Sequence, residues 1–210
     1  MKSKPLLLII GNSNVGKSSI TRLLMPNPRK FKGKVGKSPG STLLIKTTTQ
    51  NNLPYEILDL PGFGFVKHSS HRRQEHTKKQ IVLHIEKHHK DYFFSLVVIN
   101  ILRIEDELEK YFIQNKKTIP LTFELIQFLS EFNIPLLIVL NKIDKISNLD
   151  KGRLIELFVK RAKEYGLSLI HLNDYENEKN SQIPYLEFSA LKKTNLPKLK
   201  KTIQNNLIKK

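Results

Sequence analysis

The sequence has 210 residues, of which 39% are apolar, enough for one sizeable α/β core but not for two. It contains no cysteine, which excludes a disulfide-stabilised scaffold and a thiolate metal cluster and agrees with a reducing compartment. The 36 Lys and Arg residues outnumber the 19 Asp and Glu residues, and the resulting net charge of +17 favours a polyanionic partner such as RNA or anionic lipid.

The first apolar segment, Leu6–Ile10, follows a short basic start and superficially resembles a signal peptide. Its five apolar residues are few and continue into a glycine-rich loop, so we expect a buried strand instead. No segment of the sequence approaches the ~20 apolar residues that a membrane span needs. We expect a cytoplasmic protein without a transmembrane segment, and we expect it to be a monomer.

Short apolar runs alternate with longer amphipathic stretches along the chain. The runs predict buried strands at Leu6–Ile10, Tyr55–Leu60, Phe94–Ile101, Pro135–Leu140 and Tyr185–Phe188, and a threonine-rich edge strand at Thr42–Thr49. The amphipathic stretches predict helices at Lys17–Met25, Ser69–His89, Leu121–Phe132, Lys151–Tyr165 and Leu196–Leu207. This alternation predicts an α/β fold: a mostly parallel six-stranded sheet with one antiparallel edge strand and helices on both faces. Ligands of such sheets bind beyond the carboxyl ends of the strands.

The excess of basic over acidic residues is concentrated in two regions. Ten Lys and Arg residues precede Glu56, the first acidic residue, and seven lysines follow Glu187, the last one. The second region includes a basic C-terminal helix, expected over about 194–210 as part of the same domain. This asymmetry favours nucleic acid as the partner, and solvated lysine-rich surfaces are the alternative.

The first motif with chemical content follows the first strand and opens the first helix. It reads Gly11, Asn12, Ser13, Asn14, Val15, Gly16, Lys17 and Ser18, followed by Ser19. This is the phosphate-binding loop pattern: its glycines let backbone N–H groups surround a β-phosphate at a helix N-terminus. Lys17 would bridge the β- and γ-phosphates, and the Ser18 hydroxyl would bind Mg²⁺.

A second motif, Asn141-Lys142-Ile143-Asp144, directly follows the strand Pro135–Leu140. The Asp144 carboxylate can accept hydrogen bonds from the N1–H and 2-amino groups of guanine. Adenine lacks both donors and would leave this charge unpaired, at a cost of several orders of magnitude in affinity. Asn141 would tie the base to the loop, and the stem of Lys142 would pack over the ring. The tetrapeptide alone could be a helix cap, but together with the phosphate loop it predicts GTP and GDP as ligands.

Three further segments complete the predicted site. In Asp59-Leu60-Pro61-Gly62 the aspartate can hold Mg²⁺ through water, and the Gly62 N–H can contact the γ-phosphate. Within Pro39-Gly40-Ser41-Thr42, Thr42 would be the second hydroxyl ligand of Mg²⁺ beside Ser18. Phe188 ends the last strand, and the segment that follows it, Ser189-Ala190-Leu191-Lys192, would present a backbone N–H to the guanine O6. The predicted metal ligands are thus Ser18, Thr42 and Asp59.

Taken together, these motifs resemble the EngB (YihA/YsxC) family of P-loop GTPases, in the TrmE-Era-EngA-EngB-septin-like class. The most discriminating segment is Asp59–Phe65, with its alternating glycine and aromatic residues, and the resemblance spans roughly residues 5–200. It implies a Ras-like P-loop NTPase fold, one EngB-type G domain over residues 1–210, and Mg²⁺-dependent GTP hydrolysis. It also implies a role in assembly of the large ribosomal subunit, with ribosomal RNA or a ribosomal precursor particle as the partner.

Three departures from the family pattern indicate a divergent branch. Asn12 stands where the family usually has Arg, and Asn100-Ile101-Leu102-Arg103 replaces an Asp-x-Arg element. The glycine that commonly follows the Ser-Ala-x-Lys motif is replaced near Asn195.

The sequence lacks a Ras-like catalytic glutamine, because Phe63 follows Gly62 and has no hydrogen-bonding group. Intrinsic hydrolysis should therefore be slow, and either a partner or a monovalent cation could supplement it. Asn14 matches the asparagine that helps to coordinate K⁺ in related potassium-activated GTPases, although it could instead form an Asx turn. The candidate catalytic residues are Lys17, Asn14, Thr42 and Gly62. The main alternative is a non-hydrolysing, GTP-gated binding module for another polyanionic partner.

Six of the seven histidines fall within His68–His89, among several basic residues. A titratable RNA-contacting surface is the favoured interpretation. A metal site at His84 and His88 and a plain solvated helix are the alternatives. A transporter G domain or a septin-like scaffold is a third functional class, but the sequence has neither a membrane segment nor a polymerising extension.

Overall fold

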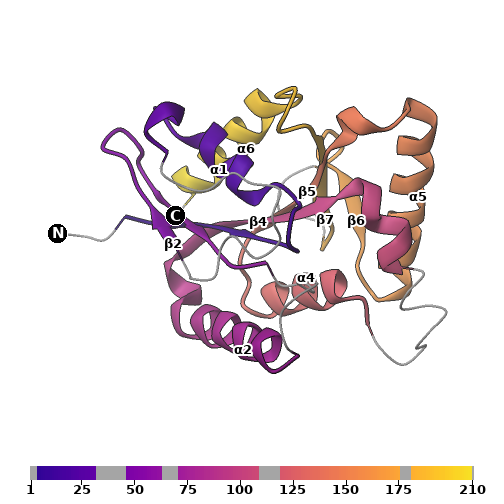
Figure 1. The fold of residues 1–210 in the computed structure, drawn as a ribbon, viewed down its shortest axis with the longest axis horizontal. Helices are drawn as coiled ribbons and strands as arrows, with labels where there is room; N and C mark the ends of the chain where they lie inside the picture. The colour runs from indigo at the N-terminus through magenta and orange to yellow at the C-terminus, as the bar shows by residue number, and fades with distance from the viewer. Residues whose placement is uncertain (1–3, 32–45, 63–70, 109–118, 176–180, 210) are drawn as a thin grey trace.

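The computed structural model describes residues 4–31, 46–62, 71–108, 119–175 and 181–209, and they form a layered α/β fold around one sheet (Figure 1). The sheet has seven strands in the order β2-β3-β1-β4-β5-β7-β6. In chain order these are β1 (Leu6–Ile10), β2 (Lys46–Thr48), β3 (Glu56–Asp59), β4 (Tyr92–Asn100), β5 (Leu136–Asn141), β6 (Leu169–His171) and β7 (Ile183–Phe188).

Every strand pairing is parallel except that of the edge strand β2 with β3, which is antiparallel. The predicted fold class is therefore confirmed, with one correction to the strand count. The additional strand is β6, whose three residues are too few to show a periodic pattern in the sequence. Of the predicted edge strand Thr42–Thr49, residues 46–48 form β2, and 42–45 lie outside the described residues.

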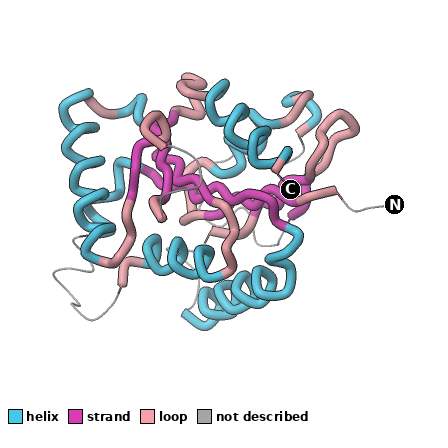
Figure 2. Tube along the Cα trace, turned by 180° about the vertical axis from the view of Figure 1, so that it is seen from behind, coloured by secondary structure: helices cyan, strands magenta, loops and turns pink. Residues whose placement is uncertain are grey.

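Two helical layers cover the sheet (Figures 1 and 2). The helices are α1 (Lys17–Leu24), α2 (His71–His88), α4 (Leu121–Glu131), α5 (Asn148–Glu164) and α6 (Leu196–Ile208). Short 3-10 turns are η1 (Pro28–Lys30), η2 (His89–Asp91), η3 (Ile101–Arg103) and η4 (Ile143–Lys145), and residues 104–108 are helical. None of the described helices combines the length and the apolar character needed to cross a membrane.

Side chains of strand β1 contribute to two apolar clusters, one on each face of the sheet. Leu7 and Ile9 belong to the cluster covered by α1 and α6, whereas Leu8 and Ile10 belong to the cluster covered by α2, α4 and α5. This division arises because successive side chains of a strand point to opposite faces of the sheet. Because the central strands are buried on both faces of the sheet, their sequences are continuous apolar runs rather than alternating apolar and polar residues.

The parallel arrangement brings the carboxyl ends of the strands other than β2 to one edge of the sheet. β1, β3, β4, β5 and β7 run parallel to their neighbours, so their carboxyl ends lie together. Asp59, Asn141 and Phe188 are the last residues of β3, β5 and β7, and the glycine-rich loop follows β1. The motifs separated in the sequence therefore meet at the edge where ligands of such folds bind.

Candidate nucleotide-binding site

The loop between β1 and α1 follows a path that requires its two glycines. Gly11 and Gly16 have φ values of 149° and 105°. A Cβ on Gly11 would collide with the carbonyl oxygen of Val98 on β4, and one on Gly16 would collide with the side chain of Asn141. The loop thus lies against β4 and the end of β5, at the start of α1, where its backbone can follow a phosphate closely.

Lys17 lies inside this loop. Its Nζ donates hydrogen bonds to the carbonyl oxygens of Gly11 and Asn12, each at 3.0 Å, and the residue is only 7% exposed. Burial lowers the pKa of Lys17 to about 8, against the opposing effect of the Asp59 carboxylate, which raises it. The loop therefore holds a buried cation where the phosphate-loop pattern places one.

Ser18 and Asp59 approach each other from α1 and β3, and the Ser18 Oγ donates a hydrogen bond to the Asp59 Oδ2 at 3.1 Å. A hydroxyl and a carboxylate are oxygen ligands that suit Mg²⁺, so this pair fits the metal that the motifs predict. The predicted third ligand, Thr42, lies outside the described residues together with Pro39, Gly40 and Ser41.

Gly62 lies directly against the phosphate loop. A Cβ at this position would collide with the Ser13 side chain and approach the Ser13 backbone nitrogen to 2.8 Å. The segment before it is fixed by a hydrogen bond of 3.2 Å from the Leu60 N–H to the Ile9 carbonyl. Gly62 therefore adjoins the phosphate loop, and its contact with a γ-phosphate stays a prediction. Phe63 lies outside the described residues.

Asn141 connects the phosphate loop to the loop after β7. Its Nδ2 donates to the Val15 carbonyl at 2.7 Å, and its Oδ1 accepts from the Ala190 N–H at 3.0 Å. The residue is 1% exposed, and its hydrogen bond to Val15 is buried, whereas the one from Ala190 is part-buried. Lys142, with φ 74°, adds a second connection by donating from Nζ to the Asn14 carbonyl at 2.6 Å.

Asp144 meets the loop after β7 through Ser189, whose Oγ donates to the Asp144 Oδ1 at 2.6 Å. The Ser189 Oγ in turn accepts from the Lys192 N–H at 2.9 Å. Asn195 has φ 61° and donates from Nδ2 to the Glu187 carbonyl at 2.8 Å. Because Asn adopts the left-handed conformation more readily than other non-glycine residues, it can stand where the family commonly has glycine.

Glu107 is a contact of the phosphate loop that the sequence interpretation missed. It lies in the helical residues 104–108, and its Oε1 accepts a hydrogen bond from the Asn12 Nδ2 at 3.1 Å. Burial raises the pKa of Glu107, while the hydrogen bond from Asn12 opposes that shift. The departure at Asn12 was visible in the sequence, but no local pattern identifies a partner 95 residues away.

The histidine-rich helix α2 packs through Ile81 and Ile85 on the opposite face of the sheet from α1. The His84 and His88 rings lie 4.6 Å apart, and burial, followed by the charges of His88 and Lys87, lowers the pKa of His84. Within the described ranges, no group of three or more His, Cys, Asp or Glu side chains is placed to hold a metal ion.

The fold and the glycine-rich loop together define a P-loop protein of the Ras-like α/β class. A family model described as "50S ribosome-binding GTPase" matches residues 7–142. The "Probable GTP-binding protein EngB" of Methanococcus aeolicus is 34% identical over 159 residues, which cover 76% of this chain and 66% of that protein. The protein of the same name from Pyrococcus abyssi is 34% identical over 146 residues, covering 69% and 65%.

A solved structure is also similar over nearly the whole chain. The crystal structure of "a probable GTP-binding protein engB" matches with a TM-score of 0.76 and 27% identity, covering 98% of this chain and 100% of that one. The chain belongs to the 50S ribosome-binding GTPase family, in its EngB branch. It spans slightly less than two thirds of the length of the two EngB relatives named above.

Proposed function

We propose that the protein is a Mg²⁺-dependent GTP-binding switch that hydrolyses GTP slowly and acts in assembly of the large ribosomal subunit through RNA contacts. The observation that carries the nucleotide part is the bridge made by Asn141 between the phosphate loop and the loop after β7. The family description and the net charge of +17 support the ribosomal part.

Guanine would be read by the loops that end β5 and β7. The Asp144 carboxylate would accept hydrogen bonds from the N1–H and the 2-amino group, and Ser189 holds that carboxylate in place. The Lys142 stem would pack on the ring, and the Ala190 segment would lie near O6. Because the loops already hydrogen-bond to each other, little ordering would be needed when the base binds.

The phosphates would lie in the loop 11–18, where Lys17 supplies positive charge. Ser18 and Asp59 would hold Mg²⁺, with Thr42 proposed as a further ligand, and the metal would neutralise charge on the β- and γ-oxygens. Gly62 would face the γ-phosphate across Ser13. Since Phe63 cannot orient a water molecule, these groups act by positioning and electrostatics, and the intrinsic rate should be low.

Potassium is the proposed supplement to this slow reaction. We expect a higher single-turnover rate of GTP hydrolysis in KCl than in NaCl at equal ionic strength, because the Asn14 side chain would help to hold K⁺ beside the phosphates. Asn14 has φ 63°, so Asn14→Gly keeps the loop conformation accessible while it removes the amide. This variant should bind GTP but lose the difference between the two salts. Equal rates in the wild-type protein would contradict the role of K⁺.

Lys17 makes nucleotide affinity depend on pH. A polyphosphate beside Nζ would raise the Lys17 pKa from about 8 toward its ordinary value, so nucleotide binding takes up a proton above that pH. GDP affinity should therefore be constant below about pH 7.5 and decrease toward pH 9, by up to roughly tenfold per pH unit. Titrations of a fluorescent GDP analogue between about pH 7 and 9 would measure this, and a flat profile would contradict the assignment.

Sedimentation with ribosomal subunits tests the proposed function as a whole. We expect the protein to pellet with the large subunit or its precursors in the presence of a non-hydrolysable GTP analogue, and to be released with GDP. Pelleting that is equal in both nucleotides would reject the switch. Multiple-turnover assays with and without particles separate the slow GTPase from a non-hydrolysing binding module, because only the GTPase produces phosphate above the amount of protein.

A further inference from the structure

The helical layer formed by α1 and α6 presents basic side chains and no acidic ones. Its exposed or half-exposed cations among the described residues are Arg22, Arg29, Lys192, Lys193, Lys198, Lys200, Lys201 and Lys209. Neither residues 17–31 nor residues 188–209 contain an Asp or Glu, although the whole chain has 19 of them. We call this surface the α1/α6 face.

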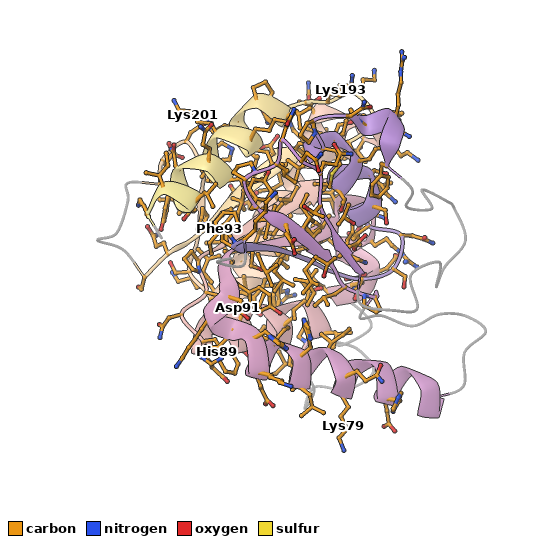
Figure 3. All side chains as sticks on the ribbon, turned by 90° about the vertical axis from the view of Figure 1, so that its left-hand side faces the viewer. Lys79, His89, Asp91, Phe93, Lys193 and Lys201 are labelled. Atoms are coloured by element: carbon orange, nitrogen blue, oxygen red, sulfur yellow. The ribbon has the colours of Figure 1, made fainter. Side chains whose placement is uncertain are left out.

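The histidine-rich helix on the opposite side of the sheet is less positive. Residues 192–209 carry six lysines and no acid, whereas the equally long α2 carries five Lys and Arg residues and two glutamates. The neighbouring helices α4 and α5 together carry five acids and five Lys or Arg residues, so they add no net charge on that side. In Figure 3, Lys193 and Lys201 extend from the upper layer, and Lys79 extends from α2 at the bottom. The stronger positive field therefore lies over α1 and α6, not over the histidines.

The α1/α6 face begins at the loop that would contact guanine. The Lys192 N–H donates to the Ser189 Oγ, and that hydroxyl donates to Asp144. Lys193 follows with φ 59°. The face is thus hydrogen-bonded to the part of the site that would bind guanine. This base is the same in GTP and GDP.

The apolar surface of this layer does not fit a lipid bilayer. Leu199 and Ile203 of α6 are buried against the sheet. The large exposed apolar residues are Leu191, 75% exposed in the loop before α6, and Ile208, 76% exposed at the last position of α6, so they do not form a stripe. A membrane-binding helix presents a continuous apolar face beside its basic residues, whereas phosphate-backbone recognition needs only the cations.

We propose that the α1/α6 face is the RNA-docking surface, on which lysines and arginines contact the phosphate backbone of a folded RNA. The proposal rests on the proposed function and names the surface and the ligand chemistry within it. The face adjoins the loop that would contact guanine rather than the γ-phosphate. It therefore contributes equally to the affinity for RNA in the GTP-bound and GDP-bound states. The nucleotide-dependent part of binding is carried elsewhere on the domain.

Two matched triple variants test the proposal. The first variant changes α6 and combines Lys198→Gln, Lys200→Gln and Lys201→Gln. The second changes α2 and combines Lys78→Gln, Lys79→Gln and Lys87→Gln. Each set replaces two exposed lysines and one half-exposed lysine. The probe is a labelled stem–loop RNA, titrated between about 50 and 200 mM KCl. The α6 variant should bind about tenfold or more weakly, with the log–log salt slope reduced by about two to three. The loss should be the same with GDP and with a GTP analogue, while affinity for a fluorescent GTP analogue is unchanged.

The outcomes separate this proposal from the wider function. An equal or larger loss in the α2 variant would overturn the assignment of the α1/α6 face. Tighter binding to phosphatidylserine-containing vesicles than to RNA would overturn the choice of ligand. If the α6 variant still pelleted with ribosomal subunits as the wild type does, only the docking surface would be wrong. If the wild-type protein bound neither the RNA nor the ribosomal subunits, that result would contradict the proposed function as well.

Discussion

Replacing Asp144 with asparagine should change the base preference of the protein from guanine to xanthine. The new side-chain amide would face the 2-amino group of guanine donor to donor, whereas xanthine carries a carbonyl at that position and can accept from it. GTP affinity should fall by about 10³-fold, and the affinity for xanthosine triphosphate should exceed it. Titration of both nucleotides against the wild type and the variant measures the change.

The fold should survive this substitution. The asparagine in Asp144→Asn keeps an Oδ1 that can accept from Ser189, so the connection between the two base-reading loops remains possible. Asp174→Asn is a matched control, because Asp174 is exposed and lies outside the site. If Asp144→Asn bound GTP as tightly as the control does, Asp144 would not be the residue that reads guanine.

The second large effect is expected for Asn141→Ala, on both stability and nucleotide binding. The change leaves the Val15 carbonyl without its partner in a buried position and the Ala190 N–H without its partner in a part-buried one. Each unsatisfied group costs about 1–3 kcal/mol, so the free energy of unfolding should fall by roughly 2–4 kcal/mol. GTP affinity should fall as well, because the phosphate loop and the base loop are no longer held at a fixed separation.

Urea unfolding and nucleotide titration measure the two effects separately. Asn205→Ala removes the same side chain from an exposed position of α6 and should leave the free energy of unfolding within about 0.5 kcal/mol of the wild type. An Asn141→Ala protein as stable as this control would mean that the buried bridge contributes little.

The sequence predicted much of the fold because its strongest signals are local. The buried strands around β1 and β5 are continuous apolar runs, and the motifs at Gly11, Asp59 and Asn141 each follow such a run directly. Parallel pairing then places them together without further information. The three-residue strand β6 carries no comparable signal and was missed.

The contacts that complete the site are long-range and could not be predicted from spacing. Glu107 and Asn12 are 95 residues apart, and each is an ordinary polar residue in its own segment. The αL conformation of Asn195 was also hidden, although the missing glycine marked the position. Such details depend on how the loops pack against each other, which a linear pattern does not record.

The close approach of Gly16 to Asn141 also constrains how this family can change through evolution. A side chain at position 16 would displace the Asn141 amide, and a bulkier residue at position 141 would press on the turn of the phosphate loop. Gly16 also has φ 105°, a conformation that side chains rarely adopt, so a smaller residue at position 141 would not compensate for its replacement. The two positions, far apart in the chain, are therefore expected to be retained together in relatives that keep this loop.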